Sequence, residues 1–331
     1  MSSSIDRVVA MSSENKVMSA SEAIEKFVSR GDCISFGGFT INRNPMALVH
    51  EMIRQRIDDL HVVMHSGSQA LDLLIGGGFV RLVEIAYGAN GRFANTCIRF
   101  RKAVEQGSIR VEDYTNYQIA LRFMAGAMGV PYLPTYSGLG SDIVEKWGFD
   151  EDLRKSRKSL PRKKLIIDND PFSQSQPLVL VPAVNPDVTL LHVHQASEEG
   201  VARIAGLPFE DIHQARASKH VIVSCEELVP SDELRQEPWL NCMPHTLVDA
   251  VVHQPFGAHP TACYRRYDYD AKHLDDYRDT AADDGLFTEY LEKYVLGVGD
   301  FNEYLNLLGH ARLEEIRASP KLGYRERVSG T

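Results

Sequence analysis

Apolar residues along this chain occur in short continuous runs that are separated by stretches with helical spacing. Ser19 and Glu22 have the spacing of a capping box, and the apolar positions that follow keep a helical period until Gly31, which predicts a first helix. Helical patterns recur at 46–56 and 117–128. The runs that predict strands lie at 33–36, 60–64, 80–86, 165–167, 178–181, 188–193, 221–223 and 247–252. This alternation predicts a parallel sheet covered by helices.

The part of the chain after Asp268 has a different pattern, because it is polar and carries two apolar stripes at helical spacing. The first stripe contains Phe287, Tyr290, Leu291, Tyr294 and Val295, and the second contains Tyr304, Leu305, Leu308, Leu313 and Ile316. We expect a C-terminal helical extension that packs on the body of the protein or on another subunit. The predicted organisation is a flexible tail over 1–15, an α/β domain over 16–264 and the extension over 265–331.

The most informative segment joins a predicted strand to a predicted helix. The strand at 33–36 runs directly into Gly37 and Gly38, and Pro45 is well placed to begin a helix. Glycine has no side chain to block a sharp turn or the close approach of a ligand, so the two amides can stay accessible. This geometry suits a thioester or a phosphate, although the same pattern is also typical of an ordinary tight turn.

Small hydroxyl residues and glycines follow two other predicted strand ends. Ser66, Gly67 and Ser68 come after the run at 60–64, and the segment 137–141 follows an extended stretch. Such residues offer amides and short donors to a carboxylate or thioester at the carboxyl edge of an α/β sheet. Each segment is also compatible with a simple turn. The members of the second segment considered for binding are Ser137, Gly138, Gly140 and Ser141.

Composition and charge exclude several classes of protein. The chain has 331 residues, of which 44% are hydrophobic and 24% are charged, as in an ordinary globular protein. Its net charge of −9 argues against a nucleic-acid binder, because phosphate binding needs a basic face. The N-terminal segment lacks a long apolar core, and no run approaches the length of a membrane span, so we expect a soluble, cytoplasmic protein.

Cysteines and histidines give no sign of a disulfide framework or a metal site. The five cysteines are odd in number and form no Cys-x-x-Cys pair. The histidines His65, His192, His194 and His259 have no ligand-like spacing to neighbouring acids. We therefore interpret these histidines as structural and expect no metal. The common phosphate-binding, zinc-protease and serine-hydrolase motifs are also missing from the sequence.

The residues around the glycine pair resemble a known family. The pattern Asp-x-Ile-x-x-Gly-Gly-Phe, followed by Pro45, is similar to the signature of the alpha chain of family I coenzyme A transferases. The variant at 39–45 resembles the A-type, or alpha, branch of the glutaconate CoA-transferase subunits. Further matches lie at 99–102, 111–114, 129–134, 194–197, 203–206, 225–227, 255–260 and 267–270. The resemblance covers nearly the whole chain, from about Lys16 to Tyr324.

This resemblance implies the three-layer α/β fold of the family, with a parallel sheet, and a mechanism that needs a glutamate. In the family, a glutamate in a Ser-Glu-Asn-Gly-like motif attacks the acyl-CoA and later carries CoA as a thioester. This chain has Ala89 at the matching position of segment 88–91, and Glu14 lies in the polar N-terminal tail. The resemblance therefore implies an alpha subunit whose nucleophile comes from a beta subunit, in a heterotetramer or heterooctamer.

The implied reaction is the transfer of CoA between short-chain monocarboxylic or dicarboxylic acids of the glutaconate type. The acyl-CoA thioester is then a substrate, and no permanently bound cofactor is expected. Gly37 and Gly38 are expected to support the oxyanion of the tetrahedral intermediates through their amides. The expected substrate-binding residues are Phe39, Arg43, Ser66, Gly67, Ser68, Ser137, Gly138, Gly140 and Ser141. Neither nucleic acid nor a membrane is expected as a partner.

Two alternatives stay open from the sequence. Related heteromers on this fold include CoA-thioester hydrolases, ring-cleaving enzymes and decarboxylases, and the deciding residue is expected in the other chain. A non-catalytic ligand-sensing module is the alternative from another class of protein. A DNA-binding helix-turn-helix and a basic face are both missing from the sequence, which counts against the sensor.

A strongly basic segment lies between 151 and 164. Its cationic members are Arg154, Lys155, Arg157, Lys158, Arg162, Lys163 and Lys164. We interpret the segment as a solvated connection, with a contact to coenzyme phosphates or to an acidic partner chain as the alternative.

Overall fold

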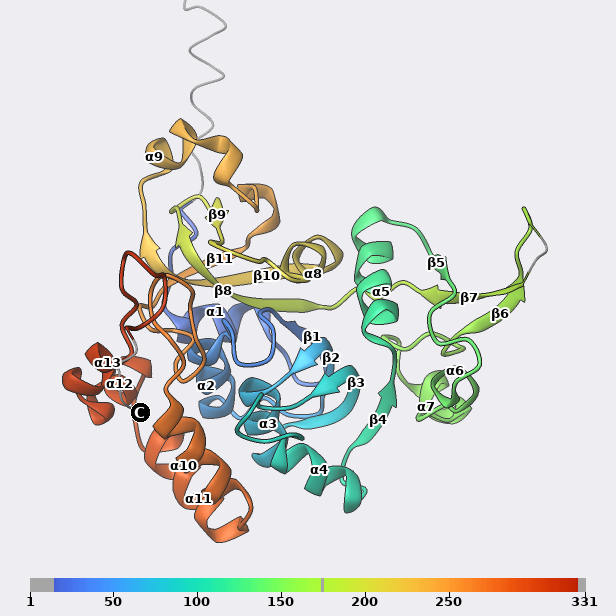
Figure 1. Ribbon diagram of the computed structural model, residues 1–331, viewed down its shortest axis with the longest axis horizontal. Coiled ribbons are helices and arrows are strands. Elements are labelled where there is room, and N and C mark those ends of the chain that lie inside the picture. Colours follow the sequence, from blue (N-terminus) through green and yellow to red (C-terminus); the bar gives the residue numbers. More distant parts are fainter. Residues whose placement is uncertain (1–14, 174–175, 327–331) are drawn as a thin grey trace, which may run out of the picture.

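The computed structural model describes residues 15–173 and 176–326, and its centre is an eight-stranded sheet between two layers of helices (Figure 1). The strands run in the order β11-β10-β8-β1-β2-β3-β4, with β9 beside β8. Every neighbouring pair along this path is parallel, and only β9 runs antiparallel to its neighbour. The strands are β1 (Cys33–Phe36), β2 (Leu60–Gly67), β3 (Val80–Gly88), β4 (Arg110–Asp113), β8 (Val188–Ala196), β9 (Ala202–Arg203), β10 (His220–Leu228) and β11 (Ala250–His253). The predicted α/β class with a parallel sheet is confirmed.

Helices cover both faces of this sheet. The first three helices and the C-terminal helices share one core with one face, whereas α5 and α8 lie against the other face. The helices are α1 (Ala20–Phe27), α2 (Met46–Arg54), α3 (Gln69–Gly76), α4 (Ile98–Glu105), α5 (Asn116–Met128), α6 (Asp142–Glu145), α7 (Glu151–Ser156), α8 (Asp211–Ala217), α9 (Ser231–Gln236), α10 (Ala271–Ala281), α11 (Asp284–Leu291), α12 (Phe301–Leu308) and α13 (His310–Glu315), with short turns of helix at η1 (Pro238–Leu240), η2 (His245–Leu247) and η3 (Glu292–Leu296). Among the described residues, none of these helices is long and apolar enough to cross a membrane.

Local sequence signals explain where several helices begin and end. The Ser19 hydroxyl accepts the Glu22 amide at 3.2 Å, and the Glu22 carboxylate accepts the Ser19 amide at 2.8 Å, so the predicted capping box is confirmed. The helix ends at Phe27, before Gly31. The glycines at 76–78 end α3 and reverse the chain, and Gly78 has a φ of +80°.

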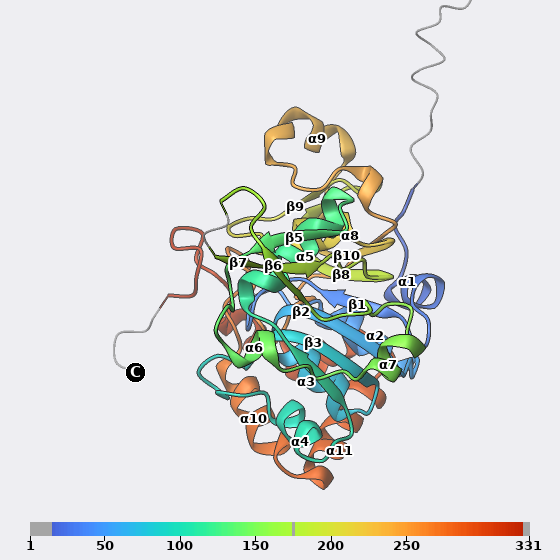
Figure 2. The ribbon, with the colours of Figure 1, turned by 90° about the vertical axis from the view of Figure 1, so that its right-hand side faces the viewer.

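Two of the predicted strands do not join the parallel sheet. The runs at 165–167 and 178–181 form β6 (Ile166–Asn169) and β7 (Pro177–Pro182), which pair antiparallel and join β5 (Tyr132–Thr135) in a separate sheet of order β5-β7-β6. Their connection is too short for the crossover that parallel neighbours need, so the chain forms a hairpin. Figures 1 and 2 show this three-stranded sheet to one side of the main sheet, with α5 between the two.

The C-terminal extension packs on the body of the protein, which is one of the two predicted arrangements. The His50 ring on α2 lies 5.0 Å from the rings of Phe301 and Tyr304. The Tyr277 hydroxyl donates to the Asp72 carboxylate on α3 at 2.8 Å, and burial raises the pKa of Asp72 to about 6. The domain boundary at 264 and 265 stays a prediction. The tail predicted over 1–15 lies, except for its last residue, outside the described residues.

The basic segment is only partly a solvated connection. The Arg154 guanidinium is buried and pairs with Glu112 of β4. The Lys164 ammonium is also buried and donates to the Ile143 carbonyl at 2.5 Å and to Asp113 at 3.2 Å. A buried cation needs such partners because leaving it unpaired is costly. The exposed members of the segment are Lys155, Lys158, Arg162 and Lys163.

Both outer strands of the main sheet lie against further chain. The Met18 amide donates to the Val251 carbonyl of β11 at 3.0 Å, and the Val251 amide donates to the Lys16 carbonyl at 2.9 Å. At the other side, a Cβ on Gly148 would lie 1.8 Å from the Val111 carbonyl oxygen of β4. The chain therefore covers β11 with residues 16–18 and β4 with the segment around Gly148.

Candidate active site

Three loops meet at the carboxyl ends of the adjacent parallel strands β1, β2 and β3, which is where α/β sheets place their ligand sites. We call residues 37–44 the glycine-pair loop. The Ser68 hydroxyl donates to the Asn44 side-chain oxygen at 2.8 Å and also to the Thr40 carbonyl. The Ala89 amide, after β3, donates to the Gly67 carbonyl at 3.0 Å. The structure thus brings the predicted Ser66–Ser68 segment and the glycine-pair loop together.

Packing alone requires both glycines of the pair. Gly38 has a φ of +82°, and a Cβ there would lie 2.2 Å from the Asn42 carbonyl oxygen. A Cβ on Gly37 would lie 2.3 Å from the Leu191 side chain of β8. Thr40 and Arg43 in the same loop also have positive φ values, of 46° and 52°. The sharp turn is therefore held in an unusual backbone conformation by its surroundings.

The amides of the glycine pair have acceptors within the protein. The Gly37 amide donates to the Leu190 carbonyl at 2.9 Å, and the Gly38 amide donates to the Asp211 carboxylate at 2.8 Å. This conformation leaves neither amide free for a ligand, in contrast to the expectation from sequence. The half-buried amides of Thr40 and Ile41 have no acceptor among the described residues.

Arg43 is buried beneath the loop, and its donors are also engaged. Its guanidinium donates to the Asp211 carboxylate at 2.5 Å and to the His192 carbonyl at 3.2 Å. A second nitrogen donates to the Leu207 carbonyl at 3.0 Å. Arg43, predicted as a substrate-binding residue, is therefore placed by the structure as an anchor of the loop. Asp211 was missed from sequence because it lies 168 residues away and belongs to no recognisable motif.

Phe39 lies beside a pocket of about 350 Å³ that borders the loop. Its ring stacks on Phe209 with a centroid distance of 4.9 Å, and the His65 ring lies 5.5 Å away. The Ser66 hydroxyl is buried and bonded to the His65 ring at 3.0 Å. The pocket is lined by Asn42, Arg43, Ala205, Gly206, Leu207, Phe209, Tyr264 and Tyr324.

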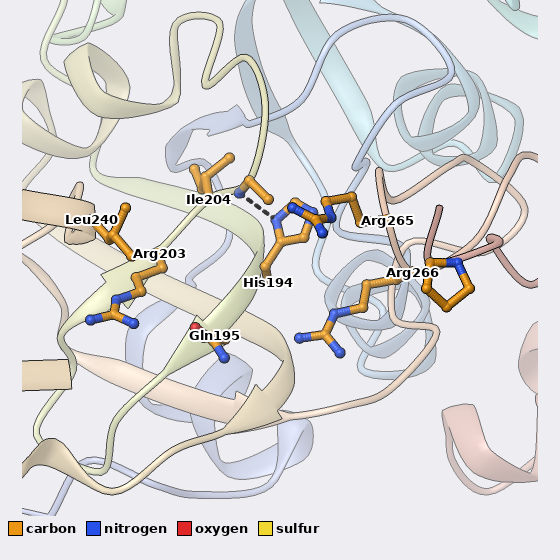
Figure 3. Close-up of a pocket in the computed structure, with 9 residues that line it drawn as sticks. His194, Gln195, Arg203, Ile204, Leu240, Arg265 and Arg266 are labelled. Carbon is orange, nitrogen blue, oxygen red and sulfur yellow. Dashed lines mark hydrogen bonds between the residues drawn. The ribbon is translucent and has the colours of Figure 1, made fainter. Parts of the chain in front are cut away.

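A second pocket, of about 510 Å³, shares Ala205 with the first (Figure 3). Three arginines, Arg203, Arg265 and Arg266, line it. The Arg266 guanidinium pairs with Glu227 at 2.6 Å, whereas Arg265 is exposed and forms no ion pair with the described residues. Arg203 is also engaged, by Asn241 at 2.7 Å and by Glu237 at 4.0 Å. Arg265 is therefore the arginine of this pocket that favours an anionic ligand group.

His194 joins the walls of the two pockets. Its Nδ1 accepts the Ala205 amide at 3.0 Å (Figure 3), and its Nε2 donates to the Tyr264 carbonyl at 2.8 Å. Burial lowers the pKa of His194 to about 4, so the ring is neutral near pH 7. This agrees with the structural role predicted for His194.

One group of side chains could hold a metal ion, since ligand atoms of His192, Glu226 and Cys263 all lie within 4.8 Å of one another. His192 already bonds to Ser224 at 2.8 Å and to Glu226 at 2.7 Å. Glu226 also accepts the Tyr267 hydroxyl at 2.8 Å, and burial raises the pKa of the Cys263 thiol. The group therefore fits a satisfied hydrogen-bond network better than a metal site. Sequence spacing could not reveal it, because its members come from separate segments.

The other predicted binding segment follows β5 of the three-stranded sheet. We call residues 137–141 the serine–glycine loop. The Ser137 hydroxyl bonds to Thr115 at 2.7 Å, and its carbonyl accepts the Gln118 side chain at 2.8 Å. The Ser141 hydroxyl donates to the Gly138 carbonyl at 2.6 Å. Within the described residues, no hydrogen bond, ion pair or ring contact joins this loop to the glycine-pair loop, and its part in substrate binding stays a prediction.

The end of β3, where the resemblance places the family's nucleophile, offers no carboxylate in this chain. Ala89 follows β3 directly and is fully buried. The neighbouring Asn90 side chain donates to Gln69 at 3.1 Å. A Cβ on Gly91 would lie 3.4 Å from the Ile41 side chain of the glycine-pair loop. The loop after β3 therefore borders the site without offering a carboxylate to it.

This architecture, with loops from adjacent parallel strands around one edge of the sheet, defines an α/β ligand-binding protein. The chain belongs to the Coenzyme A transferase family, whose model matches residues 17–254. It is 39% identical to the A subunit of glutaconate CoA-transferase of Acidaminococcus fermentans, over 94% of this chain and 97% of that protein. The crystal structure of glutaconate coenzyme A-transferase from that organism matches with a TM-score of 0.92 over 94% of this chain and 98% of that chain.

Two further relatives carry different activities in their names. The chain is 33% identical to the A subunit of 3-oxoadipate CoA-transferase of Pseudomonas knackmussii, over 87% of this chain and 96% of that protein. It is 30% identical to the cholesterol ring-cleaving hydrolase IpdA subunit of Rhodococcus jostii, over 88% of this chain and 95% of that protein. The family resemblance predicted from the glycine-pair loop is confirmed.

Proposed function

We propose that this chain is the A, or alpha, subunit of a heteromeric CoA-transferase that moves CoA between short-chain monocarboxylic or dicarboxylic acids. The observation that carries the proposal is the buried Ala89 at the end of β3, beside the glycine-pair loop. A chain of this family without a glutamate there needs a nucleophile from a second chain. Relatives that are named as the A subunits of transferases support the same conclusion.

In the proposed reaction, a glutamate of the partner attacks the acyl-CoA carbonyl and releases CoA as a thiolate, which leaves an acyl–glutamyl anhydride. The thiolate attacks the glutamyl carbonyl of this anhydride, which releases the first carboxylate and gives a glutamyl-CoA thioester. The acceptor carboxylate then attacks this thioester, and the same steps run in reverse. Every step passes through a tetrahedral intermediate whose oxyanion needs hydrogen-bond donors.

This chain supplies the shape and the donors on its side of the site. Gly37 and Gly38 hold the turn, and the amides of Thr40 and Ile41, for which the described part of the chain offers no acceptor, are the donors available to an oxyanion or a carboxylate. Phe39 contributes an apolar wall. The arginines of the second pocket suit the carboxylate end of an acid or a phosphate of the coenzyme.

The proposal is tested by reconstitution. The purified chain alone should show no CoA transfer from acetyl-CoA to a dicarboxylate, and transfer should appear when the B-type subunit of the same organism is added. Turnover by the isolated chain at a similar rate would contradict the proposal, because it would place the nucleophile in this chain.

A second candidate is a CoA-thioester hydrolase or ring-cleaving enzyme, which the similarity to the ring-cleaving hydrolase IpdA subunit supports. The two functions differ in the enzyme-bound intermediate. Under the transferase proposal, hydroxylamine or borohydride should inactivate the complex only after incubation with an acyl-CoA, since these reagents attack the glutamyl thioester. Release of free thiol without an acceptor acid, and without that inactivation, would favour hydrolysis.

A further inference from the structure

Strand β7 is apolar on both of its faces. All six residues of Pro177–Pro182 are apolar, and such continuous runs are typical of strands that are covered on both sides. Val179 and Val181 are fully buried in the core formed with α5. Leu178 and Leu180 point to the opposite face and are only half-buried. The sequence of β7 therefore predicts a second cover that the described chain does not provide.

The neighbouring strands extend this open face. Ile166 of β6 and Pro134 of β5 are both directly opposite Leu180, so the three side chains share one face. Tyr132 is opposite Pro182 on the same face. The side chains of Tyr132 and Ile166 are 49% and 46% exposed. We call the surface formed by Tyr132, Pro134, Ile166, Leu178, Leu180 and Pro182 the outer face of the three-stranded sheet.

A groove of about 360 Å³ on the outer face has a cationic rim. Besides residues of the outer face, it is lined by Pro131, Pro161 and Leu165 and by the exposed Arg162 and Lys163. Neither cation forms an ion pair within residues 15–173 and 176–326. Asp168 lies on the same face farther along β6 but does not line the groove. An apolar floor with unpaired cations at its rim complements an apolar ridge that carries acidic residues.

We propose that the outer face of the three-stranded sheet docks the partner subunit of the complex, through an apolar ridge with acidic residues. The inference rests on the proposed function, which requires a second chain. Figure 1 shows the sheet standing to one side of the body, away from the C-terminal helices. An apolar surface of this kind favours association when it is exposed on a soluble chain.

A second copy of this chain is the less suitable occupant. A two-fold contact places the same patch on both sides of the interface. It would gather Arg162 and Lys163 from both copies around one apolar contact, where like charges repel. An acidic partner surface instead pairs with these cations, and it also gives the exposed part of the basic segment a role in assembly.

Two adjacent isoleucines provide a matched test. Ile166 is on the outer face, whereas Ile167, which is 54% exposed, is opposite Val179 on the other face. Ile166→Glu should weaken binding of the purified B-type subunit about tenfold or more, because it places a charge in the apolar contact. Ile167→Glu should leave that affinity within about threefold, although both changes disturb the same strand and should lower the melting temperature of the isolated chain equally.

A charge reversal tests the rim separately. The double variant Arg162→Glu and Lys163→Glu should slow association with the partner and remove most of its dependence on salt. Circular dichroism and melting temperature should stay close to those of the wild-type chain, because both side chains are exposed.

Several results would overturn the inference. Equal loss of partner affinity in both isoleucine variants would mean that the strand, and not its outer face, is at fault, and unchanged affinity in Ile166→Glu would remove the face from the interface. Loss of self-association only would assign the face to a second copy, and weaker CoA binding by a fully assembled complex would assign the groove to the coenzyme. A wild-type chain that binds no partner would overturn the proposed function and this inference together.

Discussion

The glycine-pair loop and the serine–glycine loop look alike in the sequence, and the structure treats them differently. Both follow a strand and both combine glycines with small hydroxyl residues. The glycine-pair loop follows the central strand β1 and is fixed by Asp211 and Ser68. The serine–glycine loop follows a strand of the small sheet, and a Cβ on Gly140 there would have nothing within 4 Å of it.

The difference teaches that replacing a glycine after a strand destabilises the fold by an amount that depends on how closely the surrounding chain packs. In the glycine-pair loop, the missing side chains leave room for neighbouring backbone and for β8. In the serine–glycine loop, Gly140 is needed for its positive φ of +73° alone. Gly38 therefore meets a packing demand in addition to a dihedral one, whereas Gly140 meets a dihedral demand alone. Substitutions at the two loops can separate these demands.

The largest effect is expected for Gly38→Val. A β-branched side chain would clash with the Asn42 carbonyl oxygen and would need a φ of +82°. We therefore expect the free energy of unfolding to fall by more than about 4 kcal/mol, or the chain to be insoluble. Gly140→Ala, the matched control, should cost only about 1 kcal/mol because the space is open. Urea unfolding of both variants checks this. A Gly38→Val chain of normal stability but reduced turnover would instead show that the glycine serves ligand approach.

The next largest effect is expected for Arg43→Ala. It should lower the free energy of unfolding by about 3 to 5 kcal/mol, because it leaves the buried Asp211 carboxylate without its cation. The double variant Arg43→Ala and Asp211→Ala should lose less than the sum of the single variants. The control is Lys146→Ala, next to the serine–glycine loop, which breaks an exposed pair with Asp142 and should not change the stability measurably. Additive losses at Arg43 and Asp211 would show that the two side chains do not act as a clamp.

As the pH falls, the region around the glycine-pair loop should be destabilised at a higher pH than the serine–glycine loop. His194 has a folded-state pKa of about 4 and an unfolded value of 6.5, so the unfolded chain binds more protons as the pH falls through this window. Stability is therefore fully present above about pH 7 and should fall by up to about 3 kcal/mol by pH 4. The protection factor against hydrogen exchange of the Ala205 amide, which donates to His194, should fall over the same range. The pH dependence should shrink in His194→Gln, and an unchanged profile in that variant would rule out this histidine as its source.

The smallest effects are expected when a serine hydroxyl is removed from either region, and they should differ between Ser68 and Ser137. Ser68→Ala should cost about 1 to 2 kcal/mol, because its buried hydroxyl joins the strand end of β2 to the glycine-pair loop. Ser137→Ala should cost about 0.5 kcal/mol, since its half-buried hydroxyl bonds only to Thr115. Thermal unfolding of both variants measures the difference. Equal losses would mean that burial of the hydroxyl does not distinguish the loops.

Most of the fold could be predicted because short continuous apolar runs, which are typical of buried parallel strands, alternate with helical patterns along the chain. The run at 178–181 misled the prediction because a strand that is apolar on both faces looks the same in a parallel sheet and in an antiparallel hairpin. The length of its connection to β6 decides between the two arrangements. The burial of Arg154 was equally hidden, since its partner Glu112 lies on a strand 42 residues away.

The site could be predicted only as far as its parts are local in sequence. The glycine pair follows β1, and Ser66–Ser68 lies at the end of the neighbouring strand β2, so a parallel sheet brings them together. Phe209 reaches the same place from the segment before α8, and Asp211 is the first residue of α8. Only the folded chain shows that Asp211 binds Arg43 and that Phe209 stacks on Phe39. The amides of the glycine pair illustrate the same limit, because their acceptors come from β8 and α8.

The chain segments that cover β11 and β4 protect the protein against aggregation with other chains. An uncovered outer strand presents a row of unpaired backbone groups, which recruits strands from other molecules and promotes aggregation. Here the backbone of residues 16–18 pairs with Val251 on one side, and the segment around Gly148 blocks Val111 on the other. The main sheet is thereby closed to growth by strand addition, and other chains must approach it through its faces and loops.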